Sequence, residues 1–181
     1  DCREVLPQLE RVDLCLTDPP YGVDLGKKRN NQRFDRQTYL QGTDTADDVI
    51  PLVNEVIQIC LQRAKRTVMT PGVKNMFAYP QPSHVGSFYY PAASGCNSWG
   101  FSCWQPIYFY GKDPYGGKGS QPDSYMATLA TVKNGHPCPK PTDQWKWLLK
   151  RCSLPGEIVC DPFLGSGTTL VAARALQVKA I

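Results

Sequence analysis

Residues 12–22 read VDLCLTDPPYG, an apolar run that ends at Asp18 and passes into two adjacent prolines and a tyrosine. Proline disfavours the helical conformation in the residue before it, so the run 12–17 predicts a buried strand and not a helix. Pro19 and Pro20 lack a backbone N–H but keep their carbonyls, so the turn presents stiff acceptors beside a carboxylate and the Tyr21 ring. Such a group suits a planar partner that donates hydrogen bonds.

A second apolar run ends in the same way. Residues 158–169 read IVCDPFLGSGTT, which predicts a short strand, an Asp-Pro turn at Asp161 and a glycine-rich turn into a helix. Gly165 and Gly167 permit close backbone approach, and the N–H groups at a helix N-terminus can bind an anion. The third glycine of a dinucleotide fingerprint is missing, since residue 170 is Leu, and there is no P-loop lysine. A tight strand-to-helix turn without a ligand is the alternative.

The rest of the chain alternates between strand and helix patterns. Helical spacing of apolar residues predicts helices over 46–65, from Thr142 onward, and over 168–176. Further strands are predicted at 66–70, 88–90 and 107–110, whereas 112–135 lacks periodicity and predicts a surface loop or insertion. This alternation predicts an α/β fold with a mostly parallel sheet and helices on both faces.

Composition narrows the function classes. The 181 residues predict a single domain, and the net charge of +4 is compatible with a nucleic-acid partner. No apolar run reaches membrane-spanning length and no signal peptide is evident, so a cytoplasmic protein is expected. The eight cysteines are scattered without a C-x-x-C pair, which favours reduced thiols. The chain starts without Met and ends in an apolar run, so we expect a truncated domain within 1–181.

Metal binding is not expected. Cys96, Cys103, His136 and Cys138 could be drawn as a zinc site, but their spacing fits no usual ligand pattern.

The order of the motifs is more specific than any one of them. The sequence DPPY at 18–21 comes first, HPCPKP follows at 136–141, and DPFLGSGTT comes last. In this order the chain resembles the β class of DNA amino-methyltransferases, which form N6-methyladenine or N4-methylcytosine; the opening DCREVL at 1–6 is similar to that class too. The resemblance implies a Rossmann-like class I methyltransferase fold with circularly permuted motifs, and S-adenosylmethionine as cofactor.

The resemblance also implies site residues. Asp18 and the Pro19 carbonyl would accept the two N–H groups of an amine on a flipped base, so that its nitrogen recovers a localised lone pair, and Tyr21 would stack on that base. The catalytic residues would be Asp18, Pro19, Pro20 and Tyr21. The cofactor would contact Asp1, Asp18, Lys140, Asp161, Phe163, Gly165, Ser166, Gly167, Thr168 and Thr169. Double-stranded DNA would contact the basic residues Lys27, Lys28, Arg29, Arg33 and Arg36.

Other readings of the sequence stay open at this point. Methylation of adenine N6 is preferred to cytosine N4 because the motif begins with Asp, and residues 112–135 could form a short target-recognition insertion. Cytosine-C5 chemistry through Cys138 and methylation of RNA or protein amides both conflict with the motif order. A non-catalytic DNA-binding or regulatory module is the rival from another class. A homodimer is possible, and bacterial or phage restriction-modification and a nucleoid location would suit the family. The aromatics of 89–108 are expected to pack in core and hairpin contacts more than to face DNA: Tyr89, Tyr90, Trp99, Phe101, Trp104 and Tyr108.

Overall fold

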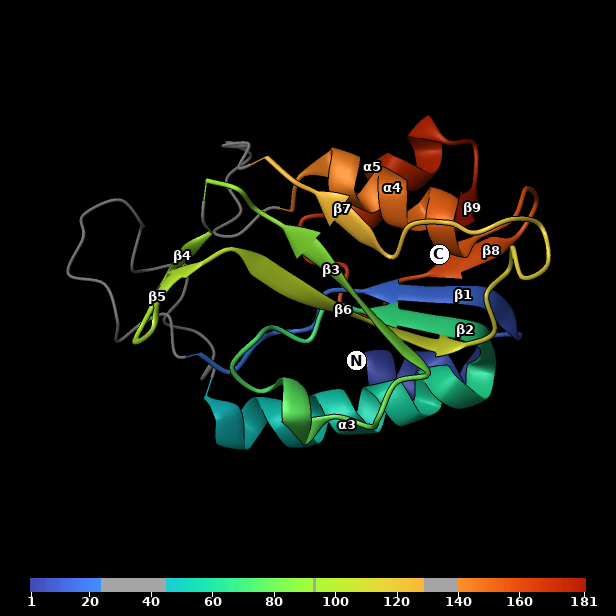
Figure 1. Cartoon of the computed structure of the whole chain (residues 1–181). Coiled ribbons are helices and arrows are strands. Elements are labelled where there is room, and N and C mark those ends of the chain that lie inside the picture. The colour runs from blue at the N-terminus through green and yellow to red at the C-terminus, as the bar shows by residue number, and fades with distance from the viewer. Residues whose placement is uncertain (24–44, 93, 129–139) are drawn as a thin grey trace.

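The computed structural model describes residues 1–23, 45–92, 94–128 and 140–181. Its centre is a seven-stranded sheet with the order β7-β3-β6-β2-β1-β8-β9 (Figure 1). These strands are β1 Val12–Thr17, β2 Ala64–Met69, β3 His84–Tyr89, β6 Trp104–Gly111, β7 Ser124–Met126, β8 Ile158–Cys160 and β9 Lys179–Ala180. The helices are α1 Cys2–Val5, α3 Ala46–Arg63, α4 Thr142–Cys152 and α5 Thr168–Ala175, with 3-10 turns η1 Leu6–Gln8 and η2 Met76–Ala78. A separate two-stranded sheet joins β4 Gly95–Asn97 to β5 Gly100–Ser102.

Most neighbouring strands of the large sheet run parallel. The pairs β1–β2, β1–β8, β8–β9 and β3–β7 are parallel, whereas β6 is antiparallel to both β2 and β3. The central strands β1 and β8 lie side by side although the chain order separates them widely, with Cys15 opposite Cys160. The mostly parallel sheet predicted from the sequence is therefore confirmed, and it brings the two Asp-Pro turns to one edge.

Helices cover both faces of this sheet. Helix α3 lies along one face, and α4 and α5 lie on the other (Figure 1). Leu14 and Leu16 of β1 are fully buried in the same core cluster as Trp145 and Leu148 of α4. Cys15 belongs to a second cluster with residues of α3. Successive side chains of a strand point to opposite faces, and both faces of β1 are covered, so Leu14, Cys15 and Leu16 at its centre are all apolar.

Helix α3 follows from its sequence pattern. Thr45 is its N-cap, and its hydroxyl oxygen accepts a hydrogen bond from the backbone N–H of Asp48. Two aspartates occupy the first turn and Arg63 the last, which suits the helix dipole. The buried residues recur at helical spacing: Val49, Val53, Val56, Ile57 and Cys60.

The structure differs from the sequence-based expectations in several places. Helix α3 ends at Arg63, and Ala64 already begins β2, so the helix is shorter than predicted. Strand β7 lies within the stretch 112–135 that was predicted to be a loop, and it pairs with β3. The hairpin β4–β5 and the short strand β9 were not predicted. Short strands of this kind are specified by a partner strand more than by their own periodicity.

The aromatic residues of 89–108 divide between core and surface. Tyr90 and Tyr108 are buried, as predicted. The expectation of core packing is wrong for four others, which are 40% exposed or more: Tyr89, Trp99, Phe101 and Trp104.

Candidate functional site

The two Asp-Pro turns meet at the carboxyl ends of β1 and β8. The hydroxyl of Thr17, the last residue of β1, donates a hydrogen bond of 2.6 Å to the carboxylate of Asp161. The backbone N–H of Phe163 lies 3.3 Å from the same hydroxyl oxygen and 3.1 Å from Asp161 Oδ1. The turn that follows β1 is therefore bonded directly to the turn that follows β8, and the two form one site. In open α/β sheets, ligands bind at this edge.

The carboxylate of Asp18 is the centre of a dense polar cluster. Its Oδ2 lies 3.0 Å from the ammonium nitrogen of Lys140, and the two side chains are only 23% and 17% exposed. Its Oδ1 accepts hydrogen bonds from the hydroxyl of Tyr21, at 2.5 Å, and from the hydroxyl of Thr70. A carboxylate has about four acceptor directions. Three donors thus leave room for roughly one more.

Tyr21 joins this cluster through its hydroxyl and its backbone. The hydroxyl oxygen accepts from Lys140 Nζ at 2.6 Å and from the side-chain amide of Gln105, and the backbone carbonyl accepts from Asn75 at 2.7 Å. Burial, together with the charge of Asp18, raises the pKa of the Tyr21 phenol, so the hydroxyl stays protonated. Tyr21 is therefore a neutral hydroxyl that holds the Asp18 carboxylate in place.

The Tyr21 ring packs against the backbone of Gly72. A Cβ built on Gly72 would lie 2.9 Å from Tyr21 Cγ, and this glycine has a φ of +70°, which favours glycine. Lys140 Nζ lies 4.6 Å from the ring centroid. The ring is thus fixed in position. Its role as a stacking surface for a base stays a prediction.

Lys140 is held as a cation by its partners. Burial alone would lower its pKa, but the charge of Asp18 and the Tyr21 hydroxyl outweigh this effect and raise the pKa above its ordinary value. The sequence-based expectation placed Lys140 near the carboxylate of a bound cofactor. In this structure its ammonium group contacts Asp18 and Tyr21, and its place beside a bound cofactor stays a prediction.

The glycine-rich turn has its own buried carboxylate. Asp161 accepts hydrogen bonds from Thr17, Phe163 and the hydroxyl of Thr169. Burial raises the pKa of Asp161 to about 6, although the three hydrogen bonds act to lower it. Trp145 of α4 donates its indole N–H to Thr169 at 2.8 Å. The hydroxyl of Thr169 is therefore used to fix Asp161 and α4 to the turn.

The start of α5 is the open part of this turn. Gly167 is the N-cap of α5 with a φ of +77°, and a Cβ built on it would meet no atom within 4 Å. Gly165 also has a positive φ, of +52°. The hydroxyls of Ser166 and Thr168 lie 3.0 Å apart at the same helix start. Backbone N–H groups at such an N-terminus suit the carboxylate of a ligand.

The remaining predicted residues fall in three groups. Asp1 caps α1 by accepting from the backbone N–H of Arg3, and its neighbour Cys2 packs in the same cluster as Cys160 and Phe163, close to the glycine-rich turn. The basic residues predicted to contact DNA lie outside the described residues: Lys27, Lys28, Arg29, Arg33 and Arg36. So do His136 and Cys138 of the zinc and cytosine-C5 alternatives.

Sequence reasoning missed Thr70 and Gln105. Thr70 follows β2, the neighbour of β1, and precedes Pro71-Gly72, so its place at the carboxyl end of a parallel strand was a usable signal. Gln105 lies on the antiparallel strand β6, and no signal in the sequence marked it as a site residue. Its carbonyl oxygen lies 3.4 Å from the hydroxyl of Tyr90, which also contacts Gln144 at 3.1 Å. These contacts extend the polar cluster from Asp18 to the start of α4.

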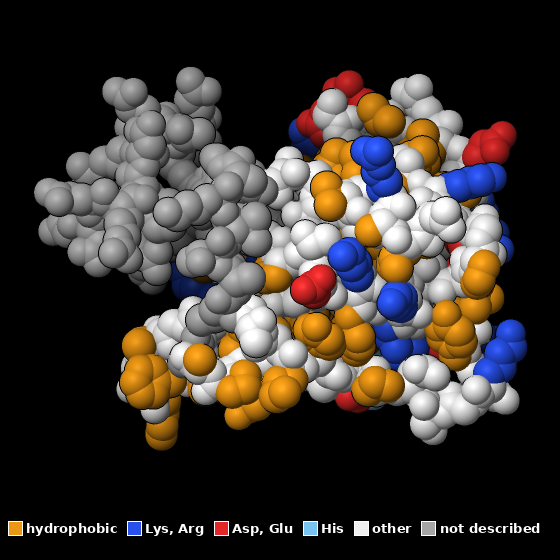
Figure 2. Space-filling view, turned by 90° about the horizontal axis from the view of Figure 1, so that it is seen from above, with side chains coloured by type: hydrophobic (Ala, Val, Ile, Leu, Met, Phe, Trp, Pro, Cys, Tyr) orange, Lys and Arg blue, Asp and Glu red, His pale blue; other side chains and the backbone are white. Residues whose placement is uncertain are grey.

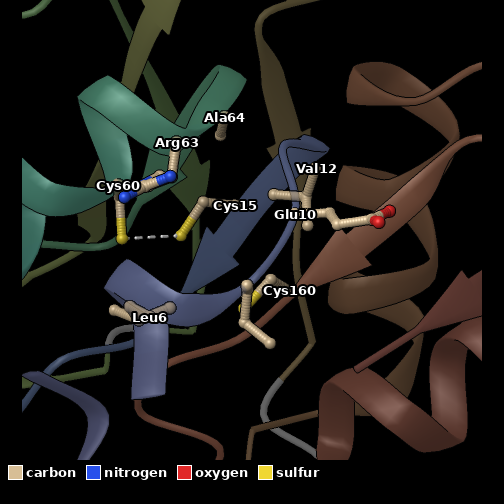
Figure 3. Close-up of a pocket in the computed structure, with 9 residues that line it drawn as sticks. Leu6, Glu10, Val12, Cys15, Cys60, Arg63, Ala64 and Cys160 are labelled. Carbon is tan, nitrogen blue, oxygen red and sulfur yellow. Dashed lines mark hydrogen bonds between the residues drawn. The ribbon is translucent and has the colours of Figure 1, made fainter. Parts of the chain in front are cut away.

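A small cavity lies among the cysteines on the α3 side of β1. Its lining includes Leu6, Val12, Arg63 and three thiols, and it has room for about one water molecule. Figure 3 shows Cys15 of β1 and Cys60 of α3 pointing toward each other, with their sulfur atoms 3.1 Å apart and Cys160 nearby. The hydrogen bond to Cys60 and burial raise the pKa of Cys15, and burial raises that of Cys160 to about 12. The thiols of Cys15 and Cys160 are therefore protonated and unreactive.

The described part of the chain shows neither a metal site nor a membrane span. No group of three His, Cys, Asp or Glu side chains among those residues is arranged to hold a metal ion. No helix there has both the length and the apolar character needed to cross a bilayer.

The second half of the chain is similar in sequence to a known family. Residues 96–181 match the family model described as DNA methylase. By this match, the second half of the chain is similar to DNA methylases. The match confirms the resemblance to DNA amino-methyltransferases that the motif order indicated. No curated protein matches the sequence.

Solved structures share the fold of the whole chain. The M1.HpyAVI–SAM complex is similar with a TM-score of 0.67 and 17% identity, over 100% of this chain and 88% of that one. PvuII DNA methyltransferase, described as cytosine-N4-specific, gives 0.69 and 14%, over 100% and 78%. A putative DNA modification methylase of Thermus thermophilus, complexed with S-adenosyl-L-methionine, gives 0.62 and 17%, over 99% and 83%. The predicted class I methyltransferase fold is confirmed by this likeness.

Proposed function

We propose that the protein transfers a methyl group from S-adenosylmethionine to the exocyclic amine of a flipped DNA base, with adenine N6 preferred to cytosine N4. The observation that carries the proposal is the cluster at Asp18. A charged carboxylate and the carbonyl of Pro19 lie at the carboxyl end of β1, bonded through Thr17 to the glycine-rich turn. The DNA methylase family of residues 96–181 supports the same reaction.

The residues of the glycine-rich turn fit the proposed cofactor. The free space beside Gly167 and the positive φ of Gly165 allow a ligand to approach the backbone at the start of α5. The N-terminus of α5 would hold the carboxylate of the methionine part, and Phe163, Ser166 and Thr168 would line the same turn. When bound, S-adenosylmethionine supplies an electrophilic methyl group on a sulfonium.

Asp18 and Pro19 would act on the amine. The lone pair of an exocyclic amine is delocalised into the base, which makes the nitrogen a poor nucleophile. Two acceptors that take its two N–H groups favour a pyramidal nitrogen with a localised lone pair. Asp18 Oδ1 and Oδ2 already have three donors, so the amine N–H takes the remaining acceptor direction or replaces one of the hydroxyls. As the nitrogen gains the methyl group and the S–CH3 bond breaks, one N–H proton would pass to the Asp18 carboxylate, whose charge Lys140 would balance before the reaction.

The proposed base preference rests on the motif. The chain has Asp as the first residue of DPPY, which the resemblance associates more with adenine than with cytosine. PvuII DNA methyltransferase, a structural neighbour, is described as cytosine-N4-specific, so both products belong in the test.

The test is a methylation assay with purified protein, S-adenosylmethionine and unmethylated DNA. Nucleosides from the digested DNA are separated by liquid chromatography and identified by mass spectrometry. We expect N6-methyladenine from the parent and a loss of at least about 100-fold with Asp18→Ala. Asp143→Ala is the matched control, because that carboxylate is 81% exposed and its ion pair with Lys146 is long, at 3.6 Å. N4-methylcytosine alone would overturn the adenine preference. Full activity of Asp18→Ala would overturn the mechanism, and DNA binding without methylation by the parent would favour a non-catalytic module.

A further inference from the structure

The hairpin β4–β5 presents aromatic side chains to solvent. Trp99 lies in its turn and is 99% exposed, and Phe101 of β5 is 76% exposed. Burying a large aromatic side chain contributes more hydrophobic free energy than burying most others, so leaving these two in water is unfavourable. Exposed apolar surface of this kind marks a contact site for a partner.

The hairpin holds Trp99 in a defined place. The side-chain oxygen of Asn97 accepts from the backbone N–H of Trp99 at 2.8 Å, and its amide donates to the Ser102 hydroxyl at 3.0 Å. The backbone N–H and the hydroxyl of Ser94 both donate to the Ser102 carbonyl, at 2.7 and 3.0 Å. Hydrogen bonds on both sides of the turn therefore fix the backbone at Trp99 before any partner binds.

The base of the hairpin adjoins the candidate site. The hairpin connects β3 to β6, and Tyr90 donates its backbone N–H to the Cys103 carbonyl at 2.7 Å where it begins. Two residues further, Gln105 donates to the hydroxyl of Tyr21. Exposed apolar side chains continue from the hairpin onto the sheet, since Trp104 is opposite Tyr89 in β3 and Tyr89 is opposite Met126 in β7. Figure 1 shows the hairpin extending beyond the main sheet at the ends of β3 and β6.

The hairpin and the two strands that it connects carry no carboxylate. Residues 84–111 contain neither Asp nor Glu. Lys74 is exposed in the loop whose Asn75 and Gly72 contact Tyr21. Figure 2 shows hydrophobic and uncharged side chains on the hairpin end of the molecule, at the lower left. No carboxylate of this stretch would repel a phosphate backbone.

We propose that the hairpin β4–β5 is a DNA-contacting element, in which Trp99 stacks on an unpaired base of the opened duplex. The inference rests on the proposed function for the identity of the partner. It adds a stacking contact outside the predicted DNA-binding residues, all of which are cationic. Aromatic rings stack on any base, so the contact contributes affinity and holds the opened duplex without reading sequence.

The experiment measures binding of a fluorescently labelled duplex by anisotropy, without methyl transfer. Trp99→Ala should raise the dissociation constant about tenfold, because base–aromatic stacking is worth that much or more. Trp99→Phe keeps a stacking ring and should stay within about threefold of the parent. Val85→Ala is the control, because Val85 is 48% exposed at the opposite end of β3 and its truncation should change nothing.

The salt dependence separates stacking from charge. Trp99→Ala should weaken binding with no change in the slope of log Kd against log salt, because it removes no charge. Lys74→Ala, the charged comparison, should lower that slope by about one if Lys74 contacts a phosphate. A Trp99→Ala protein that binds DNA as tightly as the parent overturns the inference. A Trp99→Ala protein that loses only self-association, or binding to single-stranded RNA that the parent prefers, also overturns it.

The binding experiment tests the hairpin contact separately from the proposed methyl transfer. A parent protein that binds DNA through Trp99 but forms no methylated base refutes the proposed function and supports the hairpin contact. A parent that methylates DNA, with a Trp99→Ala variant of equal affinity and equal kcat/KM, supports the function and refutes the contact.

Discussion

Lys140 Nζ lies 3.0 Å from Asp18 Oδ2 and 2.6 Å from the hydroxyl of Tyr21, so one buried cation holds both polar groups of the DPPY turn. Lys140 is far from Asp18 and Tyr21 in the sequence, and each of the three side chains is a hydrogen-bonding or ion-pair partner of the other two. Removing any one leaves the remaining groups buried with an unmet partner, which is costly in a low-dielectric site.

Lys140→Ala should lower both stability and activity. Removing the cation leaves the Asp18 carboxylate, only 23% exposed, without its charge partner, and we expect a loss of about 3 kcal/mol in the free energy of unfolding. Urea unfolding followed by circular dichroism measures this loss. Lys146→Ala is the control and should change stability by less than about 0.5 kcal/mol, since its pair with Asp143 is exposed. Equal stabilities of the two variants would contradict the prediction.

Tyr21→Phe should distinguish the role of the Tyr21 hydroxyl from the role of its ring. The variant keeps the ring on Gly72 but loses the hydrogen bonds to Asp18, Lys140 and Gln105, so Asp18 becomes less well positioned. We expect kcat to fall about tenfold or more, with KM for DNA changing little. Tyr115→Phe, which removes a hydroxyl bonded to the Ser153 carbonyl, is the matched control. A change confined to KM would show that the hydroxyl acts in DNA binding instead.

Asp161 should make stability fall as the pH rises. Burial raises its pKa from 3.8 to about 6 in the folded protein, so the folded state holds this proton more tightly than the unfolded chain. Its contribution to the free energy of unfolding therefore decreases between pH 3.8 and about 6, by about 3 kcal/mol in all, and is constant above that range.

The measurement compares the parent with Asp161→Asn across this range. Aspartates with lowered pKa values, such as Asp13 and Asp113, act in the opposite direction at lower pH, but they are common to both proteins and cancel in the difference. The difference in unfolding free energy should change with a midpoint between about pH 4 and about pH 6. A difference that does not depend on pH would contradict the raised pKa.

The buried thiols should resist alkylation. Cys15, Cys152 and Cys160 are buried and have raised pKa values, whereas Cys96 is exposed. Iodoacetamide at about pH 7.5 followed by peptide mass spectrometry should modify Cys96 within minutes and leave the three buried thiols unmodified for at least about 100 times longer. In denaturant, all four should react at similar rates. Rapid labelling of Cys15 in the native protein would show that the cavity beside Cys60 opens.

The elements that carry a strong local pattern could be predicted from the sequence. Strands β1 and β8 were found because an Asp-Pro turn ends each, and α3 because its buried residues recur at helical spacing. The hairpin β4–β5 and strand β7 were not found, because strands of three residues are too short to show a period. Their conformation depends on the strands beside them.

The residues of the candidate site were likewise predicted only where they belong to a local sequence motif. Asp18, Tyr21 and Asp161 stood in recognisable motifs, and the structure places all three in one connected group. Thr70 and Gln105 complete the group from the end of β2 and from β6, and only the tertiary fold brings them to Asp18 and Tyr21. Lys140 was recognised, but motif order alone could not reveal that its charge would be directed to Asp18.

The pairing of β1 with β8 has a consequence for how the protein is made. Leu14 of β1 is opposite Val159 of β8. The two central strands can therefore pair only after the ribosome has synthesised β8 and the long segment that separates it from β1. Until then, one edge of β1 has unpaired backbone groups, and its apolar side chains are not fully buried. Contacts between residues so far apart in the sequence also form slowly. The nascent chain is therefore exposed to aggregation during translation. Chaperones that shield β-edges should raise its yield more than they raise the yield of proteins whose central strands are neighbours in sequence.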